Sequence, residues 1–238
     1  MEICKRLLVT GGATGIGRAV AMACSPPAQI VVADMNVKDA EQTVKIVSAA
    51  GGLARFIRCD VTDEDSVKEL VAESVELMGG IDGLVTAAGV LQAAAVPIEE
   101  IDPADWSRTI EVNVYGSFFC VKHALPTLRR SEFGVVILIG SPAGLISGSS
   151  SVPYATSKGG VYGLSKALSG RLASDCIRLN LLMPGSIDTP LKRGAEEAMK
   201  TSGKPRKQNL GDPAGVAKVV RFLISDEAEY VRGEIFTR

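Results

Sequence analysis

The sequence predicts an α/β protein whose core is a doubly wound, mainly parallel, seven-stranded sheet with helices on both faces. Short apolar, β-branched runs alternate with helix-length segments along the chain. The runs are hydrophobic nearly throughout, rather than at every second residue, which is typical of parallel strands that are covered on both faces. A glycine-rich turn follows the first run directly, where such a sheet passes from strand to helix.

Six of these runs predict strands, at 6–10, 30–33, 55–59, 84–86, 135–139 and 177–183, and a seventh strand-like run begins at Gly233. The alternation of strands and helices implies right-handed crossovers. Asp102-Pro103 and Asp212-Pro213 each place an N-cap residue before a proline, which predicts two helix starts. The stretch Thr62-Asp63-Glu64-Asp65 resembles a capping box and predicts a third. The Ser- and Gly-rich stretch 140–153 is expected to be a loop.

The length of 238 residues favours a single domain over 1–238, although two small domains would also fit. The chain is 46% hydrophobic and 22% charged, as in soluble globular proteins. A net charge of −1 gives no footprint for nucleic acid or a membrane surface. No apolar run is long enough for a bilayer span, and the N-terminal MEICKRLLVTGG leaves no room for a signal peptide.

The five cysteines are scattered and form no C-x-x-C pattern, so we expect buried free thiols and a reducing, cytoplasmic location. No metal site is expected, because His123 is the only histidine and lies in a helical pattern that favours a structural role. The basic segment 200–208 is predicted to be a mobile surface loop. A role in binding a substrate phosphate is the alternative for that segment.

The first turn, TGGATGIG at 10–17, does not fit the spacing G-x-G-x-x-G. Four glycines in seven positions nevertheless exceed what a turn needs, and glycine lets phosphates approach the backbone. Amide groups at the start of the following helix would face a pyrophosphate. Asp34 ends the second run, where an acid holds a ribose hydroxyl. The alternative interpretation is a glycine-rich turn beside a surface aspartate.

The spacing T-G-x-x-x-G-x-G resembles the glycine turn of the short-chain dehydrogenase/reductase family. The resemblance continues in order over nearly the whole chain, through Cys59-Asp60-Val61-Thr62, Thr86-Ala87-Ala88-Gly89-Val90, Asn113, Ser141, Tyr154-Ala155-Thr156-Ser157-Lys158 and Pro184-Gly185-Ser186-Ile187-Asp188-Thr189. It implies a Rossmann-type fold and an oxidoreductase that uses NAD or NADP to interconvert a secondary alcohol and a ketone.

Tyr154 and Lys158 are four residues apart, so a helix would place them on one face. A nearby ammonium, together with a positively charged nicotinamide, is expected to lower the pKa of Tyr154 so that it serves as acid and base. The resemblance assigns these roles to the pair and has Lys158 grip the nicotinamide ribose. It assigns Ser141 to the substrate oxygen, and Asn113 to a helix bend and a water in a proton relay. Taken singly, each residue would also fit an ordinary structural role.

Asp34 favours NAD, because its carboxylate would accept from the ribose 2′-hydroxyl and repel the 2′-phosphate of NADP. Arg18 follows the glycine turn and is a candidate to meet such a phosphate, but Asp34 is expected to dominate. Ile187 and Thr189 are implied to hold the nicotinamide carboxamide. The full set of predicted cofactor-binding residues is Gly11, Thr14, Gly15, Ile16, Gly17, Asp34, Asp60, Val61, Ala88, Gly89, Tyr154, Lys158, Pro184, Gly185, Ile187 and Thr189.

The predicted substrate side consists of Leu91, Gln92, 142–146, Ser186 and 191–210, a largely apolar set that suits an apolar alcohol or ketone. Segments 105–128 and 154–172 carry surplus apolar residues, among them Val114, Phe118, Val161 and Leu164, which suits a homodimer or homotetramer.

The chain departs from the family pattern at two places. Thr86 and Ala87 stand where the family has asparagines, and the chain ends at Arg238 with a short C-terminal tail. These departures motivate an alternative function, a nucleotide-binding sensor or scaffold without catalysis. A third candidate is epimerisation or dehydration with bound NAD, although relatives of that kind carry an added substrate region.

Overall fold

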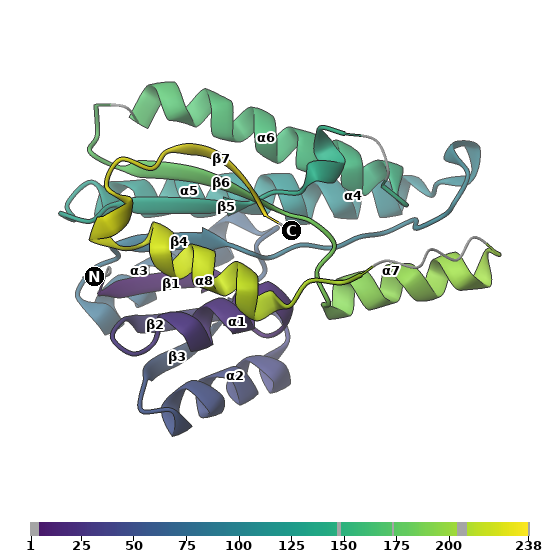
Figure 1. Cartoon of the computed structure of the whole chain (residues 1–238). Helices are drawn as coiled ribbons and strands as arrows, with labels where there is room; N and C mark the ends of the chain where they lie inside the picture. Colours follow the sequence, from purple (N-terminus) through teal and green to yellow (C-terminus); the bar gives the residue numbers. More distant parts are fainter. Residues whose placement is uncertain (1–4, 147–148, 173, 204–208, 238) are drawn as a thin grey trace.

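A computed structural model describes residues 5–146, 149–172, 174–203 and 209–237. Its sheet has the strand order β3-β2-β1-β4-β5-β6-β7, and every pair of neighbours is parallel (Figure 1). The strands are β1 (Arg6–Thr10), β2 (Gln29–Asp34), β3 (Leu53–Arg58), β4 (Gly83–Thr86), β5 (Val135–Ile139), β6 (Arg178–Pro184) and β7 (Gly233–Thr237). The predicted doubly wound, seven-stranded sheet is therefore confirmed, and the observed pairing is wholly parallel.

Helices cover both faces of the sheet. They are α1 (Gly15–Cys24), α2 (Val37–Ala49), α3 (Glu64–Met78), α4 (Pro103–Ile110), α5 (Gly116–Leu128), α6 (Val152–Leu172), α7 (Pro190–Thr201) and α8 (Pro213–Leu223). Leu7 and Val9 pack into the core with α1, α2 and α8, whereas Leu8 between them packs with α3, α5 and α6. The central strands β4 and β5 are buried throughout because their successive side chains enter these two different cores, whereas the edge strand β3 alternates between buried and exposed residues.

The helices α4 and α8 begin at the N-cap residues that the sequence predicts, and α3 begins one residue away from its predicted start. Asp102 and Asp212 accept hydrogen bonds from the amides of Ala104 and Ala214, both at 2.8 Å, as predicted. The predicted capping box is displaced by one residue, because Asp63 rather than Thr62 caps α3. The Thr62 hydroxyl instead donates to Asp60 at 2.7 Å, so it is engaged away from the helix start.

At the amino ends of the strands, Asp82 lies just before β4 and is 3% exposed. Arg6 donates to both of its carboxylate oxygens, from Nε at 3.0 Å and from Nη2 at 2.6 Å. The Ser131 hydroxyl donates to Asp82 at 2.6 Å and the Lys5 amide at 3.2 Å. Burial alone would raise the pKa of Asp82, but these donors outweigh it and lower the pKa.

Several expectations about single residues need correction. Cys24, Cys59 and Cys120 are buried free thiols, but Cys176 is exposed, in a turn where its φ is +54°. Cys4 lies outside the described residues. Val161 is fully buried in the core, because it faces the sheet from α6, and so it is not a surplus surface residue.

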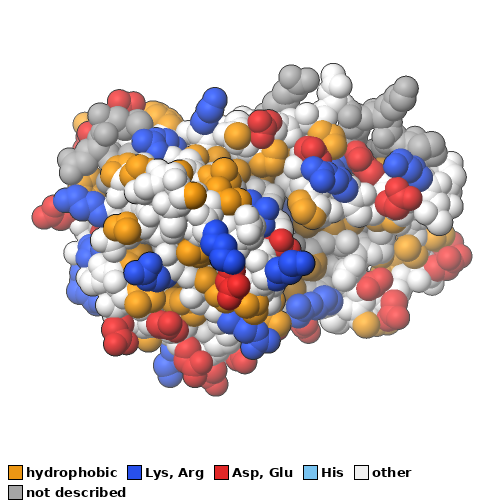
Figure 2. Space-filling view, turned by 90° about the horizontal axis from the view of Figure 1, so that it is seen from below, with side chains coloured by type: hydrophobic (Ala, Val, Ile, Leu, Met, Phe, Trp, Pro, Cys, Tyr) orange, Lys and Arg blue, Asp and Glu red, His pale blue; other side chains and the backbone are white. Residues whose placement is uncertain are grey.

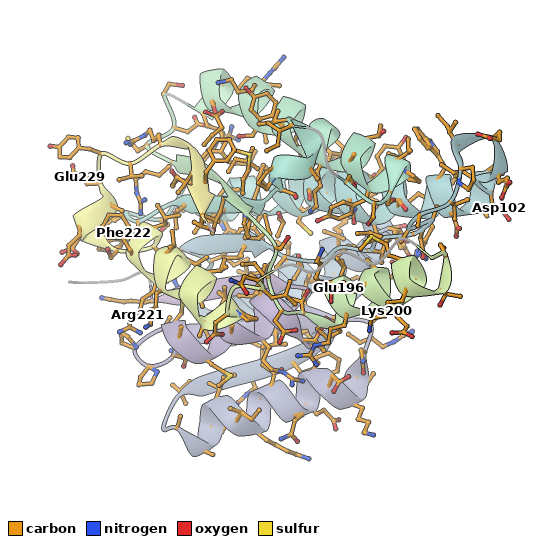
Figure 3. The ribbon with its side chains drawn as sticks, turned by 45° about the vertical axis from the view of Figure 1, so that its right-hand side comes forward. Asp102, Glu196, Lys200, Arg221, Phe222 and Glu229 are labelled. Atoms are coloured by element: carbon orange, nitrogen blue, oxygen red, sulfur yellow. The ribbon has the colours of Figure 1, made fainter. Side chains whose placement is uncertain are left out.

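The segment 200–208 is also not a single loop. Lys200 and Thr201 form the end of α7, and 204–208 lie outside the described residues. Figure 3 shows Lys200 and Glu196 on this helix. His123 contacts Glu64 at 2.9 Å, a contact that fits the structural role expected of it.

The surface carries mixed charge. On the face drawn in Figure 2, acidic and basic side chains are interspersed, and the described residues there gather no broad patch of one sign. Within the described ranges, no helix is both long enough and apolar enough to span a bilayer.

Candidate active site

A cavity of about 550 Å³ opens at the carboxyl ends of the strands. It lies where the chain reverses its direction across the sheet, since β2 and β3 follow on one side of β1 and β4 on the other. Ligands of open α/β sheets bind at this type of position. Every predicted cofactor-binding residue lines the cavity, as do Ser141 and, from the predicted substrate side, Leu91 and Ser186.

The glycine turn is shaped by close packing. Gly11 has a φ of +68°, and a Cβ there would overlap the backbone nitrogen of Ala88 at the end of β4. A Cβ at Gly17 would overlap the carbonyl of Gly11. Gly11 and Gly17 are therefore needed for the close packing of the turn against the segment after β4 and against itself.

The start of α1 differs from that of most other helices. Thr14 precedes α1 and makes no side-chain cap hydrogen bond, whereas the residues before α2, α3, α4, α7 and α8 all accept one. The first-turn residues Gly15, Ile16 and Gly17 line the cavity. Their backbone amides thus direct the partial positive charge of a helix N-terminus into the cavity.

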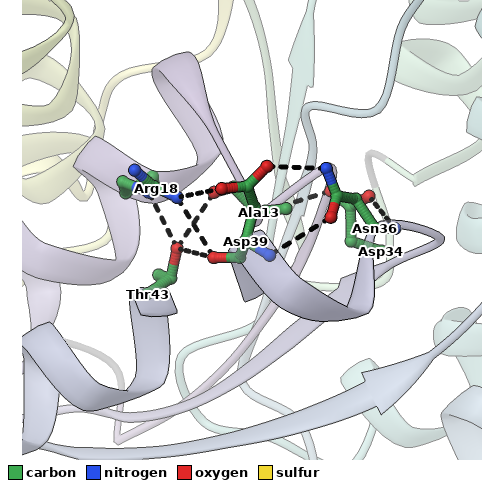
Figure 4. Close-up of polar contacts among 6 residues, drawn as sticks. All are labelled: Ala13, Arg18, Asp34, Asn36, Asp39 and Thr43. Atoms are coloured by element: carbon green, nitrogen blue, oxygen red, sulfur yellow. Dashed lines mark hydrogen bonds and ion pairs between the residues drawn. The ribbon is translucent and has the colours of Figure 1, made fainter. Parts of the chain in front are cut away.

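Asp34 is fixed at the end of β2 by two backbone amides (Figure 4). Its Oδ2 accepts from Ala13 at 3.0 Å, within the glycine turn, and its Oδ1 accepts from Asn36 at 2.9 Å. Arg18 points elsewhere: its Nε donates to the Thr43 hydroxyl at 2.9 Å and its Nη2 lies 3.5 Å from the Asp39 carboxylate. Arg18 does not line the cavity, so the negative charge of Asp34 faces it without that guanidinium.

Asp60 and Val61 line the same end of the cavity. Burial works to raise the pKa of Asp60, but the amide and hydroxyl of Thr62 donate to its carboxylate and hold the pKa below its usual value. Arg108, on α4, also lines the cavity and lies 3.4 Å from the Thr62 hydroxyl. Arg108 carried no sequence signal, because only the fold brings α4 beside this turn.

Lys158 and Tyr154 lie together on α6. The Nζ of Lys158 is 5.7 Å from the centre of the Tyr154 ring and donates to the carbonyl of Ile139 at 2.8 Å. Lys158 is only 6% exposed, and burial lowers its pKa to about 8. The side chains thus share one helix face, as their spacing predicted.

The pKa of Tyr154 is raised in the protein alone, whereas the predicted lowering also counted the charge of a nicotinamide. Burial raises it, and a hydrogen bond with Ser141 only partly counteracts that effect. The prediction weighed the attraction of the ammonium and of a nicotinamide, but not the cost of burying a phenolate. Ser141 itself accepts from the amide of Ala143 at 3.2 Å, at the start of a 3₁₀ turn (Pro142–Gly144).

Asn113 lies behind the cavity rather than in its wall. It is buried in a π-helical turn (Glu111–Tyr115) between α4 and α5, which is the helix irregularity expected at this position. Its side chain donates to Val90 O at 3.0 Å and to the Ser157 hydroxyl at 2.8 Å, and accepts from Val90 N at 2.9 Å. Asn113 therefore fixes the segment that follows β4, and it is not among the residues that line the cavity.

Two serines that hold the backbone of Tyr154 were not predicted from the sequence. The Ser151 hydroxyl accepts from Tyr154 N at 3.1 Å, and the Ser157 hydroxyl donates to Tyr154 O at 2.8 Å. Serine is common near helix starts, so neither residue stood out without the contacts.

The substrate side is smaller than predicted. Its described lining residues are Leu91, Pro142, Ala143, Ile146, Ser149, Ser150, Ser186, Leu191 and Lys192. Gln92, Gly144 and Leu145 do not line the cavity, and of the described part of 191–210 only Leu191 and Lys192 do. The reason is that this segment forms α7, which runs out beyond the carboxyl ends of the strands (Figure 1). No group of three or more His, Cys, Asp or Glu suited to a metal occurs among the residues that the structure describes.

Comparisons with known proteins agree with this arrangement. The family model described as enoyl-(acyl carrier protein) reductase matches residues 11–237. A cis-4-hydroxycyclohexanecarboxylate dehydrogenase of Sinomonas cyclohexanicum is 35% identical over 230 residues, which cover 96% of this chain and 92% of that protein. A 2,5-dichloro-2,5-cyclohexadiene-1,4-diol dehydrogenase of Sphingobium indicum is also 35% identical, over 96% of this chain and 92% of that protein.

Among solved structures, an actinorhodin polyketide ketoreductase with NADPH superposes with a TM-score of 0.91. It is 27% identical, and the match covers 98% of this chain and 95% of that one. The fold and the site define a nicotinamide-dependent oxidoreductase of the Rossmann type. The chain belongs to the short-chain dehydrogenase/reductase family.

Proposed function

We propose that this protein is an NAD-dependent oxidoreductase that interconverts a cyclic secondary alcohol and its ketone, with Tyr154 as the acid and base. The observation that carries the proposal is the placement of Tyr154, Lys158 and Ser141 on one cavity with the glycine turn and Asp34. Asn113 supports this group from behind.

The residues present fit a dinucleotide. The start of α1 has no side-chain cap and faces the cavity, as a diphosphate requires. Asp34 would accept from the adenosine ribose, and Asp60 and Val61 would flank the adenine. Lys158 would hold the nicotinamide ribose, while Ala88, Gly89, Pro184, Gly185, Ile187 and Thr189 would line the nicotinamide side.

A nicotinamide held there would supply the hydride chemistry, as acceptor from the alcohol carbon in oxidation and as donor to the carbonyl carbon in reduction. Tyr154 accepts the alcohol proton on its phenolate oxygen during oxidation and donates it during reduction. Lys158 keeps a positive charge 5.7 Å from the ring and so favours the phenolate. Ser141 donates its single hydroxyl proton to the substrate oxygen, in place of the hydrogen bond that it makes with Tyr154 in the protein alone.

Substitution of Tyr154 tests this assignment. In Tyr154→Phe, turnover should fall by about 10²–10⁴-fold, because the proton transfer is lost. NADH affinity, followed by nicotinamide fluorescence, should stay within about twofold, because the ring remains in place. Activity close to wild type in this variant would refute the proposed role and would favour the non-catalytic sensor.

The choice of NAD over NADP rests on Asp34 and on the diversion of Arg18 to Thr43 and Asp39. Titrations with NADH and NADPH should show NADH binding at least about tenfold more tightly, since a like charge opposes the 2′-phosphate. Asp34→Asn should narrow the difference between the NADH and NADPH affinities, because it removes the charge; its single amide oxygen keeps only one of the two bonds from the amides of Ala13 and Asn36. Arg18→Ala is the matched control and should leave the NADPH affinity unchanged. Preferential NADPH binding by the wild type would overturn the choice.

The substrate class follows from the lining and from the relatives. Leu91, Pro142, Ala143, Ile146 and Leu191 offer an apolar wall to a ring. Two dehydrogenases that this chain resembles are named for hydroxylated six-membered rings. Cyclohexanol and 4-hydroxycyclohexanecarboxylate are therefore the first substrates to assay with NAD, with an open-chain secondary alcohol of similar size as the comparison.

We also propose that the protein is a cytoplasmic homodimer or homotetramer. The buried thiols of Cys24, Cys59 and Cys120 suit a reducing compartment, and burial raises the pKa of Cys24 to about 12. Phe118 is exposed on α5, Val114 is partly buried one turn before it, and Leu164 is partly buried on α6. Sedimentation at micromolar concentration would show a monomer if this proposal is wrong.

A further inference from the structure

We propose that Ser151 is a positioning residue for Tyr154, which ties the catalytic helix to the strained segment 92–95 beside the substrate side of the cavity. The inference rests on the role proposed for Tyr154. Ser151 lies immediately before α6 and is 2% exposed. Nothing in its sequence context distinguishes it from the serines around it.

The Ser151 hydroxyl makes two hydrogen bonds of opposite sense. It accepts from Tyr154 N at 3.1 Å, which satisfies an amide of the first helical turn. It donates to Gln92 O at 2.6 Å, across 59 residues of sequence. One buried hydroxyl therefore joins the backbone of the catalytic tyrosine to the segment that follows β4.

That segment has an unfavourable backbone conformation. Ala93 and Ala95 have φ values of 52° and 63°, a region that alanine rarely adopts because its Cβ crowds the following carbonyl. Ala95 N donates to Ser150 O at 2.7 Å, next to the Ser151 contact. Such conformations persist only where surrounding contacts impose them, and these two contacts come from the residues that start the catalytic helix.

Hydrogen bonds thus join segment 92–95, beside the cavity wall, to the start of the catalytic helix α6. Leu91, Ser149 and Ser150 line the cavity on either side of this junction. Ser157 holds the Tyr154 carbonyl, but it connects to Asn113 and not to segment 92–95. Ser151 is accordingly the link by which the position of the wall sets the position of the Tyr154 oxygen.

The experiment replaces Ser151 by alanine and has two readouts, kcat and the ionisation of Tyr154, with the NADH affinity as a control. With NAD and cyclohexanol, kcat should fall roughly tenfold or more, because small misplacements of a catalytic group are costly, while NADH affinity stays within about twofold. Ultraviolet absorbance should follow the ionisation of Tyr154, taken as the difference between each protein and its Tyr154→Phe counterpart. In Ser151→Ala this titration should move by about half a pH unit or more toward that of free tyrosine, as the loosened turn admits water.

Three further variants make the result specific. Ser151→Thr keeps the hydroxyl and should restore both readouts. Ser151→Gly is tolerated at helix starts and replaces the alanine variant if that one fails to fold. Ser169→Ala removes a serine hydroxyl that also bonds the backbone of α6, to Ser165 O at 2.8 Å, and should change neither readout.

The titration needs no substrate, so it decides the inference whether or not cyclohexanol is turned over. A Ser151→Ala protein whose Tyr154 titrates as in the wild type would overturn the positioning role. If at the same time Tyr154→Phe is inactive, the proposed function survives and only this inference fails. An active Tyr154→Phe would instead overturn the function on which the inference rests.

Discussion

The two ends of the parallel sheet handle buried charge differently. At the amino end, the Asp82 carboxylate receives donors from Arg6, Ser131 and Lys5. At the carboxyl end, the Lys158 ammonium is buried against a neutral carbonyl, and burial depresses its pKa. The buried charge of Asp82 at the amino end therefore stabilises the fold. The buried charge of Lys158 at the carboxyl end destabilises it.

Backbone conformation follows the same division. Ala93 and Ala95 are held at positive φ beside the cavity at the carboxyl end. Strained or poorly solvated groups are common at functional sites, because the rest of the fold is stable enough to impose them. The contrast predicts that substitutions at the amino end affect stability, while those at the carboxyl end affect activity and stability in opposite directions.

Asp82→Ala should have the largest effect on stability. Removing one partner of a buried ion pair leaves the other without compensation, and we expect a loss of roughly 3 kcal/mol in the free energy of unfolding. That value is at the low end for such pairs because the Arg6 side chain is 30% exposed. Urea denaturation at pH 7 measures it. The activity per folded molecule should be unchanged. A loss of activity without a loss of stability would contradict the proposed contrast between the two ends of the sheet.

The stabilising effect of Asp82 should depend on pH. The folded protein holds its pKa below the ordinary value, so the unfolded chain binds the proton first as the pH falls. The contribution is fully present above the unfolded pKa, about 4, and is lost as the pH falls through the lower folded value. The difference in the free energy of unfolding between wild type and Asp82→Asn should therefore shrink as the pH falls from about 5 to about 2.

Lys158→Met should abolish turnover and stabilise the protein. Burial moves the pKa of Lys158 from 10.5 to about 8, which corresponds to a cost of up to roughly 3 kcal/mol for the charged form. Below pH 8 the wild type bears this full cost. Between about 8 and 10.5 the unfolded chain holds more protons, so wild-type stability rises with pH and the advantage of the variant declines. Equal stability of the two proteins at pH 7 would show that the charge is not costly.

These contrasts mark the limit of prediction from sequence. The strand runs and the glycine turn were predictable because burial on both faces and close packing leave a local pattern, and the candidate site emerged from motifs in a fixed order. The pKa direction of Tyr154, the diversion of Arg18 and the contacts of Ser151 were not predictable. Each depends on which segments the fold brings together across tens of residues, and neither residue type nor spacing encodes that.

Ala95→Gly should have the smallest effect, a gain of about 0.5–1 kcal/mol in the free energy of unfolding, because glycine relieves the positive φ and costs less than that strain in chain entropy. Ala94 lies between the two strained alanines and is not at positive φ, so Ala94→Gly is the matched control. Its free energy of unfolding should fall by about as much as that of Ala95→Gly rises. Thermal unfolding of both variants by calorimetry gives the comparison. If both lose stability equally, segment 92–95 stores no strain, and the conformation of the cavity wall requires no restraint from the start of α6.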